Sequence, residues 1–168
     1  MEGSTAASIE RVAVIGAGTM GSGIAQVFAV AGLAVTLVDV SDDLVARGLD
    51  GIRGGLARMV ERGRLDTETR DAALGRIAAS TAVGEAARAD LVVEAIVERL
   101  ETKVELLAEL DRRAPAHTIL ASNTSSISIT RLAAATGRPD RVIGMHFMNP
   151  APVMALVEVI RGLATSDA

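Results

Sequence analysis

A group of residues near the start of this chain could hold a dinucleotide. Gly16, Gly18 and Gly21 form the pattern G-x-G-x-x-G directly between a strand-like apolar run and a helical pattern. A glycine loop in that context presents backbone N–H groups and the positive end of a helix dipole to a pyrophosphate. Asp39 ends the next apolar run about twenty residues on, where a carboxylate can accept hydrogen bonds from both ribose hydroxyls and repel a 2′-phosphate. The pattern therefore predicts an NAD site rather than an NADP site.

Each glycine of this loop has a different expected task. Gly16 permits a tight turn, Gly18 lets the pyrophosphate come close to the backbone, and Gly21 lets the helix pack tightly on the strands. Thr19 and Met20 stand between the second and third glycines and complete the expected cofactor loop. The alternative is a loop that only turns the chain, but the strand, the helix, the second strand and the acid around it favour a binding loop.

A histidine and a glutamate near the end of the chain could act as a general base and its partner. If the turn after His146 is centred near Ala151 or Pro152, then His146 and Glu158 fall opposite or nearly opposite on one sheet face. Directly paired residues have Cβ atoms about 5 Å apart. A carboxylate there orients the imidazole and stabilises its protonated form, as a general base for an alcohol requires. A register slip of one residue would separate the two, and a surface ion pair is the alternative interpretation.

Polar residues follow two further apolar runs of the chain. Residues 94–103 come after one run and 122–126 after the next, where ligands of a parallel sheet bind. For Ser125 and Ser126 the alternative interpretation is an N-cap for a helix beginning at Ile127, which is compatible with a binding role for the neighbouring residue.

The elements that must position these residues alternate along the chain, which predicts an α/β fold of Rossmann type with a doubly wound, mostly parallel sheet. The strand-like runs are residues 12–15, a run ending at Asp39, 77–83, 89–96, 118–121, 141–147 and 153–160. The helical patterns are one after the glycine loop, 98–113 and 127–135. The last strand follows a turn too short for a crossover, so it is expected to be antiparallel.

Residues 42–76 depart from this alternation, because two helical patterns follow each other with no strand between them. They predict a helical hairpin that projects from the domain, with Thr67 capping its second helix. Arg47, Arg53 and Arg58 could meet a phosphorylated ligand there, although arginines on a helix face are commonly only solvated.

Composition limits the function classes. The net charge of −4 leaves no basic footprint for nucleic acid. The absence of cysteine excludes disulfides and thiolate ligands, and no metal site is predicted. No apolar run approaches the roughly 18 residues that span a membrane, and the N-terminus does not have the composition of a signal peptide, so a soluble cytoplasmic protein is expected. Residues 1–8 are expected to be disordered and 9–168 to form one domain.

Four stretches resemble the NAD-binding domain of the L-3-hydroxyacyl-CoA dehydrogenases, including the 3-hydroxybutyryl-CoA dehydrogenases. They are VAVIGAGTMGSGIAQVFAVAG, DLVVEAIVERLETK, ASNTSSISIT and GMHFMNPAPVMALVEVI, in the family's order and spacing. The last three are more specific than the glycine motif, and the match covers nearly the whole chain. The resemblance implies oxidation of an L-3-hydroxyacyl-CoA to the 3-ketoacyl-CoA with NAD, or the reverse reaction.

The resemblance also implies roles for individual residues. His146 is similar to the family's general base on the 3-hydroxyl, and Glu158 to the carboxylate that holds it. Ser125 matches the serine that hydrogen-bonds the substrate oxygen near the nicotinamide. Three more residues match family positions near the cofactor: Glu98, Lys103 and Asn149. The hairpin of residues 42–76 matches the insertion that contacts the acyl-CoA.

The family pattern continues beyond this sequence with a helix, a strand, a substrate-contacting asparagine and a dimerising helical domain. The chain is therefore expected to be the cofactor-binding part of the enzyme, to which a companion helical domain or a homo-oligomer could contribute. Two alternatives stay open: a non-catalytic fragment that binds NAD or acyl-CoA, and a 3-hydroxyacid dehydrogenase of the 6-phosphogluconate type. Asp39 and the pair of His146 and Glu158 argue against the second, which favours a catalytic lysine.

Overall fold

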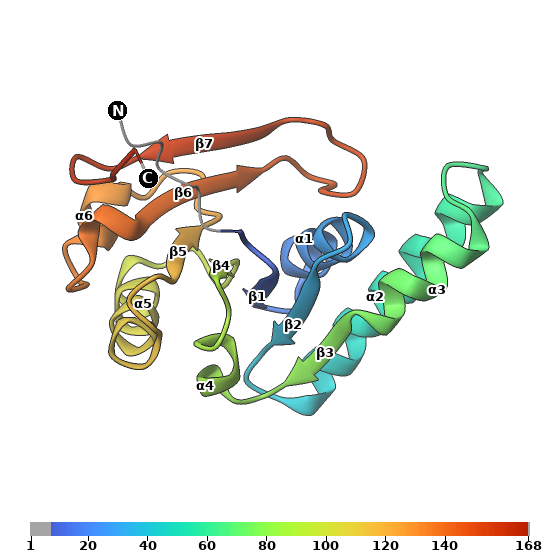
Figure 1. The fold of residues 1–168 in the computed structure, drawn as a ribbon, viewed down its shortest axis with the longest axis horizontal. Helices are drawn as coiled ribbons and strands as arrows, with labels where there is room; N and C mark the ends of the chain where they lie inside the picture. Colours follow the sequence, from blue (N-terminus) through green and yellow to red (C-terminus); the bar gives the residue numbers. More distant parts are fainter. Residues whose placement is uncertain (1–7, 168) are drawn as a thin grey trace.

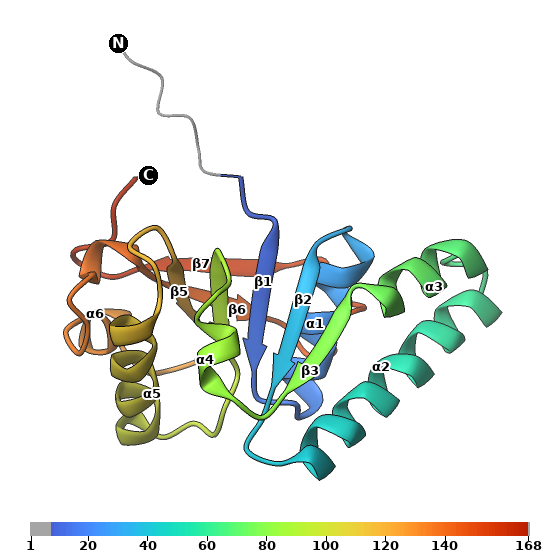
Figure 2. The same cartoon turned by 60° about the horizontal axis from the view of Figure 1, so that its bottom comes forward.

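The computed structural model describes residues 8–167, which contain a seven-stranded sheet with helices on both faces (Figures 1 and 2). The strand order is β3-β2-β1-β4-β5-β6-β7; the first six strands are parallel and β7 is antiparallel to β6. The strands are β1 (Arg11–Ile15), β2 (Ala34–Val38), β3 (Ile77–Ser80), β4 (Leu91–Glu94), β5 (Ile119–Ser122), β6 (Val142–Phe147) and β7 (Val157–Arg161). This order confirms the predicted doubly wound fold and its final antiparallel strand.

The helices lie in two groups, one on each face of the sheet. They are α1 (Thr19–Val30), α2 (Asp42–Glu61), α3 (Thr67–Gly75), α4 (Val83–Ala86), α5 (Leu100–Arg113) and α6 (Ile129–Ala133), with a 3-10 turn at Pro139–Arg141. Alternate residues of β1 point to opposite faces, so Val14 packs in the α1 to α3 layer and Ala13 in the layer of α4 to α6.

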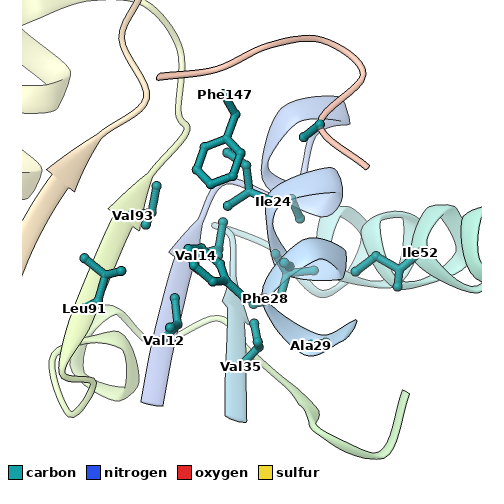
Figure 3. Packing of buried hydrophobic residues seen from close by; sticks show 14 of the residues in the cluster. Val12, Val14, Ile24, Phe28, Ala29, Val35, Ile52, Leu91, Val93 and Phe147 are labelled. Carbon is teal, nitrogen blue, oxygen red and sulfur yellow. The ribbon is translucent and has the colours of Figure 1, made fainter. Parts of the chain in front are cut away.

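The core beneath α1 carries the two phenylalanines of the chain (Figure 3). Val14 of β1 and Val93 of β4 pack against Ile24 and Phe28 of α1. Phe147, the last residue of β6, meets Phe28 edge-on with ring centroids 5.9 Å apart and an interplanar angle of 73°. Because Phe147 follows His146 in the chain, this contact fixes the end of the strand that carries the candidate base.

Both helices of the predicted hairpin are present, and their connection extends past the sheet edge (Figures 1 and 2). The hairpin is nevertheless anchored, since Ile52, Leu56 and Ala73 are buried in the core beneath α1. Gly48 allows this packing because a Cβ atom there would lie 2.8 Å from that of Ala17. α2 therefore lies against the outer side of α1, next to the glycine loop.

Local capping differs from the sequence-based expectation at two helices. Asp66, rather than Thr67, caps α3, and its carboxylate accepts a hydrogen bond of 2.6 Å from the Thr69 amide. Ser128, rather than Ser125 or Ser126, caps α6, because the helix begins two residues later than the pattern indicated. Because α3 begins at Thr67, its N-cap position falls on Asp66, and aspartate caps helices at least as well as threonine.

Three strands are clearly shorter than expected, and one of them is β4, which spans Leu91–Glu94 rather than residues 89–96. β3 ends at Ser80, and the residues that follow form the short helix α4, whose N-cap is Ala82. β7 begins at Val157, because residues 153–156 belong to the connection after β6. The expectation for residues 1–8 falls, apart from Ser8, outside the described residues.

Asp90 ties together the amino ends of three strands, at the opposite edge from the glycine loop. Its carboxylate accepts hydrogen bonds from the backbone amides of Glu10 and Arg11, at 3.1 and 2.9 Å, and from the Arg11 guanidinium at 3.0 Å. His117, just before β5, lies 3.3 Å from the same carboxylate. The hydrogen bond from Arg11 is the main cause that lowers the pKa of Asp90 well below its usual range.

We expect Asp90→Asn to destabilise the fold by about 1.5–3 kcal/mol at pH 7, the range for hydrogen bonds to charged groups. A carboxyl whose folded-state pKa is lowered stabilises the fold above its unfolded pKa and loses that contribution as the pH falls. The difference from wild type should therefore be complete above about pH 5 and shrink below about pH 4. Thermal unfolding across this range measures it. Asp50→Asn, at an exposed pair with Arg53, is the control and should unfold like wild type; equal melting of Asp90→Asn and wild type at pH 7 would contradict the prediction.

Candidate functional site

The carboxyl ends of the parallel strands meet at one edge of the sheet (Figure 2). The residues singled out in the sequence lie at or just after these strand ends. Each neighbouring strand delivers one part: the glycine loop follows β1, Asp39 follows β2, Glu98 follows β4, Ser125 follows β5 and His146 lies near the end of β6. This edge is where an open α/β sheet binds its ligands.

The geometry of the glycine loop fits a bound pyrophosphate. Gly16 has a φ of +101°, and a Cβ atom there would lie 2.6 Å from the carbonyl oxygen of Ala95. At Gly21 a Cβ atom would lie 1.6 Å from the carbonyl oxygen of Gly16, so only glycine fits. At Gly18 a Cβ atom would meet no protein atom within 4 Å. Two glycines are thus required by the turn and by packing, whereas the third leaves open the surface at the N-terminus of α1.

Asp39 supports this loop from the end of β2. One carboxylate oxygen accepts a hydrogen bond of 2.7 Å from the Ala17 amide and the other accepts one of 2.7 Å from the Val40 amide. A carboxylate offers about four lone-pair sites, so acceptor capacity remains for ribose hydroxyls. Asp39 therefore has a structural role in holding the loop, and its contact with the cofactor stays a prediction.

His146 and Glu158 form the cross-strand pair that the turn predicted. The antiparallel register places the two residues directly opposite, and His146 Nδ1 lies 2.8 Å from Glu158 Oε2. An ionised carboxylate can only accept, so Nδ1 donates and Nε2 is left as a proton acceptor. The imidazole is thus held in the tautomer and orientation that a general base needs.

A cavity of about 300 Å³ brings the remaining candidates together. His146 and Ser125 lie on it from β6 and from the connection after β5. The other sequence-predicted residues on its wall are Met20, Glu98, Lys103 and Asn149. The cavity thus brings together a candidate base, a hydroxyl and Met20 of the glycine loop, an arrangement compatible with transfer of hydrogen between a substrate and a nicotinamide.

A buried ion pair lies behind this cavity. The side chains of Glu94 and Lys103 are 0% and 1% exposed, and Lys103 Nζ lies 2.9 and 2.7 Å from the two carboxylate oxygens of Glu94. Ser122 donates a short hydrogen bond to the same carboxylate. Burial, partly offset by the charge of Lys103, raises the pKa of Glu94 above its ordinary value.

Glu98 joins the ion pair to the Ser125 loop, which we define as residues 123–127. Its Oε1 accepts hydrogen bonds from the Thr124 hydroxyl, from the Ser125 amide at 3.2 Å and from the Ser126 hydroxyl at 3.3 Å. Partial burial acts to raise the pKa of Glu98, but the hydrogen bond from Thr124 and the charge of Lys103 outweigh it and the pKa is lowered. Glu98 is therefore ionised at neutral pH and is a strong acceptor for this loop.

Sequence reasoning placed residues 94–103 and 122–126 at this edge but assigned no individual role to four members of the site: Glu94, Ser122, Asn123 and Thr124. One signal was available for the ion pair, since Lys103 follows Leu100 by three positions and precedes Leu107 by four, on the apolar stripe of α5. A lysine inside an apolar stripe requires a buried partner. Asn123 gave no such signal, although its Oδ1 accepts a hydrogen bond of 2.8 Å from the Phe147 amide and so joins the ends of β5 and β6.

A larger cavity of about 540 Å³ extends from the glycine loop along α1 and α2 to the connection between β6 and β7. Among the arginines considered from the sequence, Arg47 and Arg58 line it, and Arg53 instead pairs with Asp50 at 2.8 Å. Two further arginines line the same cavity: Arg62 and Arg64. Such a concentration of guanidinium groups suits a ligand that carries phosphates.

Two tests on the described residues give negative results. Across residues 8–167 no cluster of three or more His, Cys, Asp or Glu side chains could hold a metal ion. Within the same range no helix is long and apolar enough to cross a membrane.

Comparisons with known proteins agree with this geometry. Residues 11–168 match the family model described as "3-hydroxyacyl-CoA dehydrogenase, NAD binding domain". A probable 3-hydroxybutyryl-CoA dehydrogenase of Bacillus subtilis is 54% identical over 160 residues, which cover 95% of this chain and 55% of that protein. The mitochondrial hydroxyacyl-coenzyme A dehydrogenase of Homo sapiens is 47% identical over 165 residues, which cover 95% of this chain and 52% of that protein.

Solved structures show the same similarity. The crystal structure of (S)-3-hydroxybutyryl-CoA dehydrogenase from Ralstonia eutropha matches with a TM-score of 0.92 and 51% identity, over 95% of this chain and 56% of that one. The crystal structure of M. tuberculosis FadB2 matches with a TM-score of 0.92 and 46% identity, and the match covers 95% of this chain and 56% of that one. The chain spans about half the length of the curated relatives it matches.

The glycine loop yields a prediction with an internal contrast. Gly18→Ala should melt like wild type, because the added Cβ atom meets no protein atom. It should nevertheless bind NADH at least about tenfold more weakly, a loss of about 1.4 kcal/mol in binding free energy, because the methyl group occupies the surface proposed for the pyrophosphate. Gly21→Ala should instead lower the melting temperature strongly. Calorimetric titration with NADH and thermal unfolding measure both. Gly75→Ala in α3 is the control with unchanged binding, and undiminished NADH affinity in Gly18→Ala would exclude this loop as the pyrophosphate site.

Proposed function

The chain belongs to the 3-hydroxyacyl-CoA dehydrogenase family through its NAD-binding domain, and we propose that it is the cofactor-binding half of such an enzyme. The proposed reaction is oxidation of an L-3-hydroxyacyl-CoA to the 3-ketoacyl-CoA with NAD, or its reverse. The observation that carries the proposal is the 2.8 Å hydrogen bond between His146 and Glu158, in a cavity shared with Ser125. Family membership also decides against a 3-hydroxyacid dehydrogenase of the 6-phosphogluconate type.

In the proposed reaction each of these residues has its own task. His146 Nε2 accepts the proton of the 3-hydroxyl group while Glu158 stabilises the imidazolium that forms. The Ser125 hydroxyl hydrogen-bonds the same substrate oxygen. As the O–H proton leaves, the C3–O bond becomes a carbonyl and the hydrogen on C3 departs with its electron pair. NAD, when bound, supplies the acceptor for that hydride.

The acyl-CoA class of substrate has its own support in the larger cavity. Coenzyme A carries several phosphate groups, and guanidinium groups bind phosphates through two parallel hydrogen bonds. We assign the phosphates of the substrate to the arginines of α2 and of the connection that follows it. This assignment agrees with the expected contact between residues 42–76 and acyl-CoA.

The proposed enzyme needs a second part to close its cleft, since the curated relatives are about twice as long as this chain. A covering domain excludes water from the reacting groups, which strengthens their electrostatic interactions. We propose that a helical domain, supplied by the same polypeptide or by a companion chain, provides this cover. The alternative is a fragment that binds NAD or acyl-CoA without turnover.

A measurement of turnover distinguishes the proposed dehydrogenase from the fragment that only binds NAD or acyl-CoA. NADH oxidation with acetoacetyl-CoA should be measured with the chain alone and after addition of the separately expressed C-terminal domain of the Bacillus subtilis relative, together with calorimetric titration of NAD. Turnover in either case supports the dehydrogenase, whereas NAD binding without turnover in both indicates the binding fragment. An absence of NAD binding would contradict both functions.

We expect His146→Ala to lower kcat by about 10²–10⁴, the usual contribution of a general base, and to leave NADH affinity nearly unchanged. Activity is measured by acetoacetyl-CoA-dependent NADH oxidation in whichever form of the protein turns over. His117→Ala is the matched control, because His117 is the other of the two histidines and lies with Asp90 at the opposite edge of the sheet. Full activity in His146→Ala would remove this residue from the mechanism.

Substitution of Asp39 should change cofactor preference. Asp39→Asn removes the charge that repels a 2′-phosphate but retains one oxygen, which can still accept from the Ala17 amide and support the loop, whereas the exposed Val40 amide loses its acceptor. We expect NADH to bind about tenfold more weakly and the preference over NADPH to narrow, by about 1–2 kcal/mol. Titration of both cofactors measures this. Equal weakening for NADH and NADPH would mean that Asp39 serves only the loop.

A further inference from the structure

We propose that Glu94 and Lys103 form a buried positioning unit that acts through Glu98 to fix the Ser125 loop at the cavity. This inference rests on the proposed dehydrogenase function, in which Ser125 contacts the substrate oxygen. It assigns a role to Glu94, and it gives Lys103 a positioning role at the cavity wall.

The donors of Lys103 are all used inside the protein. An ammonium has three N–H donors. Two point to the carboxylate oxygens of Glu94, at 2.9 and 2.7 Å. The third is left for Glu98 Oε2 at 3.3 Å and the carbonyl oxygen of Ile96 at 3.5 Å. Lys103 therefore borders the cavity with its ammonium directed toward these protein acceptors.

Glu98 carries this constraint outward to the loop. Its Oε2 faces Lys103, whereas its Oε1 accepts from the Thr124 hydroxyl and the Ser125 amide. The Thr124 hydroxyl oxygen in turn accepts from the Ile127 amide at 2.9 Å. Because 41% of the Glu98 side chain is exposed, its contact with the buried Lys103 ammonium is what ties it to the interior.

The same unit holds the loop from its other end. Glu94 and Ser122 are paired across β4 and β5, and the Ser122 hydroxyl donates to the Glu94 carboxylate. That hydroxyl oxygen accepts a hydrogen bond of 3.2 Å from the Thr124 amide. The contacts at Thr124 and Ser125 therefore lead back to one buried carboxylate and one buried ammonium, whereas Asn123 is held separately by its hydrogen bond with the Phe147 amide.

Stability alone does not account for this ion pair. Desolvation of two charges costs several kcal/mol, and an apolar pair of similar volume often stabilises a core equally well or better. The pair does, however, connect the end of β4 to two other parts of the site, since Lys103 contacts Glu98 and Glu94 accepts a hydrogen bond from Ser122. Its benefit is geometric, because an active-site hydroxyl must be held by supporting hydrogen bonds to stay aligned with its substrate.

The test compares a paired substitution with a single one in this chain. Glu94→Gln combined with Lys103→Met removes both charges and retains an acceptor for Ser122, so no unpaired buried charge remains. Glu98→Ala removes the acceptor of the Ser125 amide at a partly exposed position. The matched control combines Glu109→Gln with Arg113→Gln, which removes an exposed ion pair of the same helix.

Amide hydrogen exchange followed by NMR is the main measurement, since it needs no turnover. We expect exchange at Ser125, Ser126 and Ile127 to rise at least about tenfold in both test variants, with the rest of the chain protected as in wild type. The control should match wild type everywhere. In the form of the protein that turns over, the KM for acetoacetyl-CoA should rise more than kcat falls.

Two results would overturn the inference. Wild-type exchange of the Ser125 loop in Glu98→Ala, or in the folded paired variant, would show that the loop does not depend on this network. Loss of protection throughout the paired variant, including failure to fold, would show that Glu94 and Lys103 serve stability instead. If the dehydrogenase function itself is wrong, the chain shows no turnover but the local change in exchange is still observed.

Discussion

The approach of α1 to the first strand is the constraint on which the site depends. The backbones meet so closely at Gly21 and Gly16 that a single Cβ atom would lie 1.6 Å from a carbonyl oxygen. This contact places the N-terminus of α1 over the loop and sets the distance at which Phe28 reaches Phe147. One helix, α1, therefore positions the glycine loop, the core beneath it and the end of β6. A change in the packing of α1 would displace all three.

Much of this arrangement could be predicted because it follows from local rules. The glycine spacing and the alternation of elements specify a doubly wound sheet, and the short connection after His146 specifies an antiparallel strand with Glu158 opposite. Each of these depends on a few neighbouring residues. The caps of α3 and α6 were predicted wrongly for the same reason, because adjacent residues such as Asp66 and Thr67 have similar capping strength and only the helix start decides between them.

The network behind the cavity could not be predicted because it joins residues from three separate elements. Glu94 ends a strand whose other residues are buried and apolar, so its burial gives no separate signal in the sequence. Lys103 lies on the apolar stripe of α5, which indicates that it has a buried partner but does not identify that partner. The partner is identified only when the end of β4 and the first turn of α5 are placed together.

The exposure of the candidate base indicates what the rest of the reaction requires. The side chains of His146 and Glu158 are 22% and 50% exposed, so water still screens the interaction that should hold the imidazolium. Large apolar side chains are exposed on the same pair of strands and their connection, including Met154, Leu156 and Ile160. A single apolar surface placed over these residues would remove them from water and lower the local dielectric around the dyad at once. In the proposed enzyme, closure of the cleft would therefore also strengthen the electrostatic interaction between His146 and Glu158.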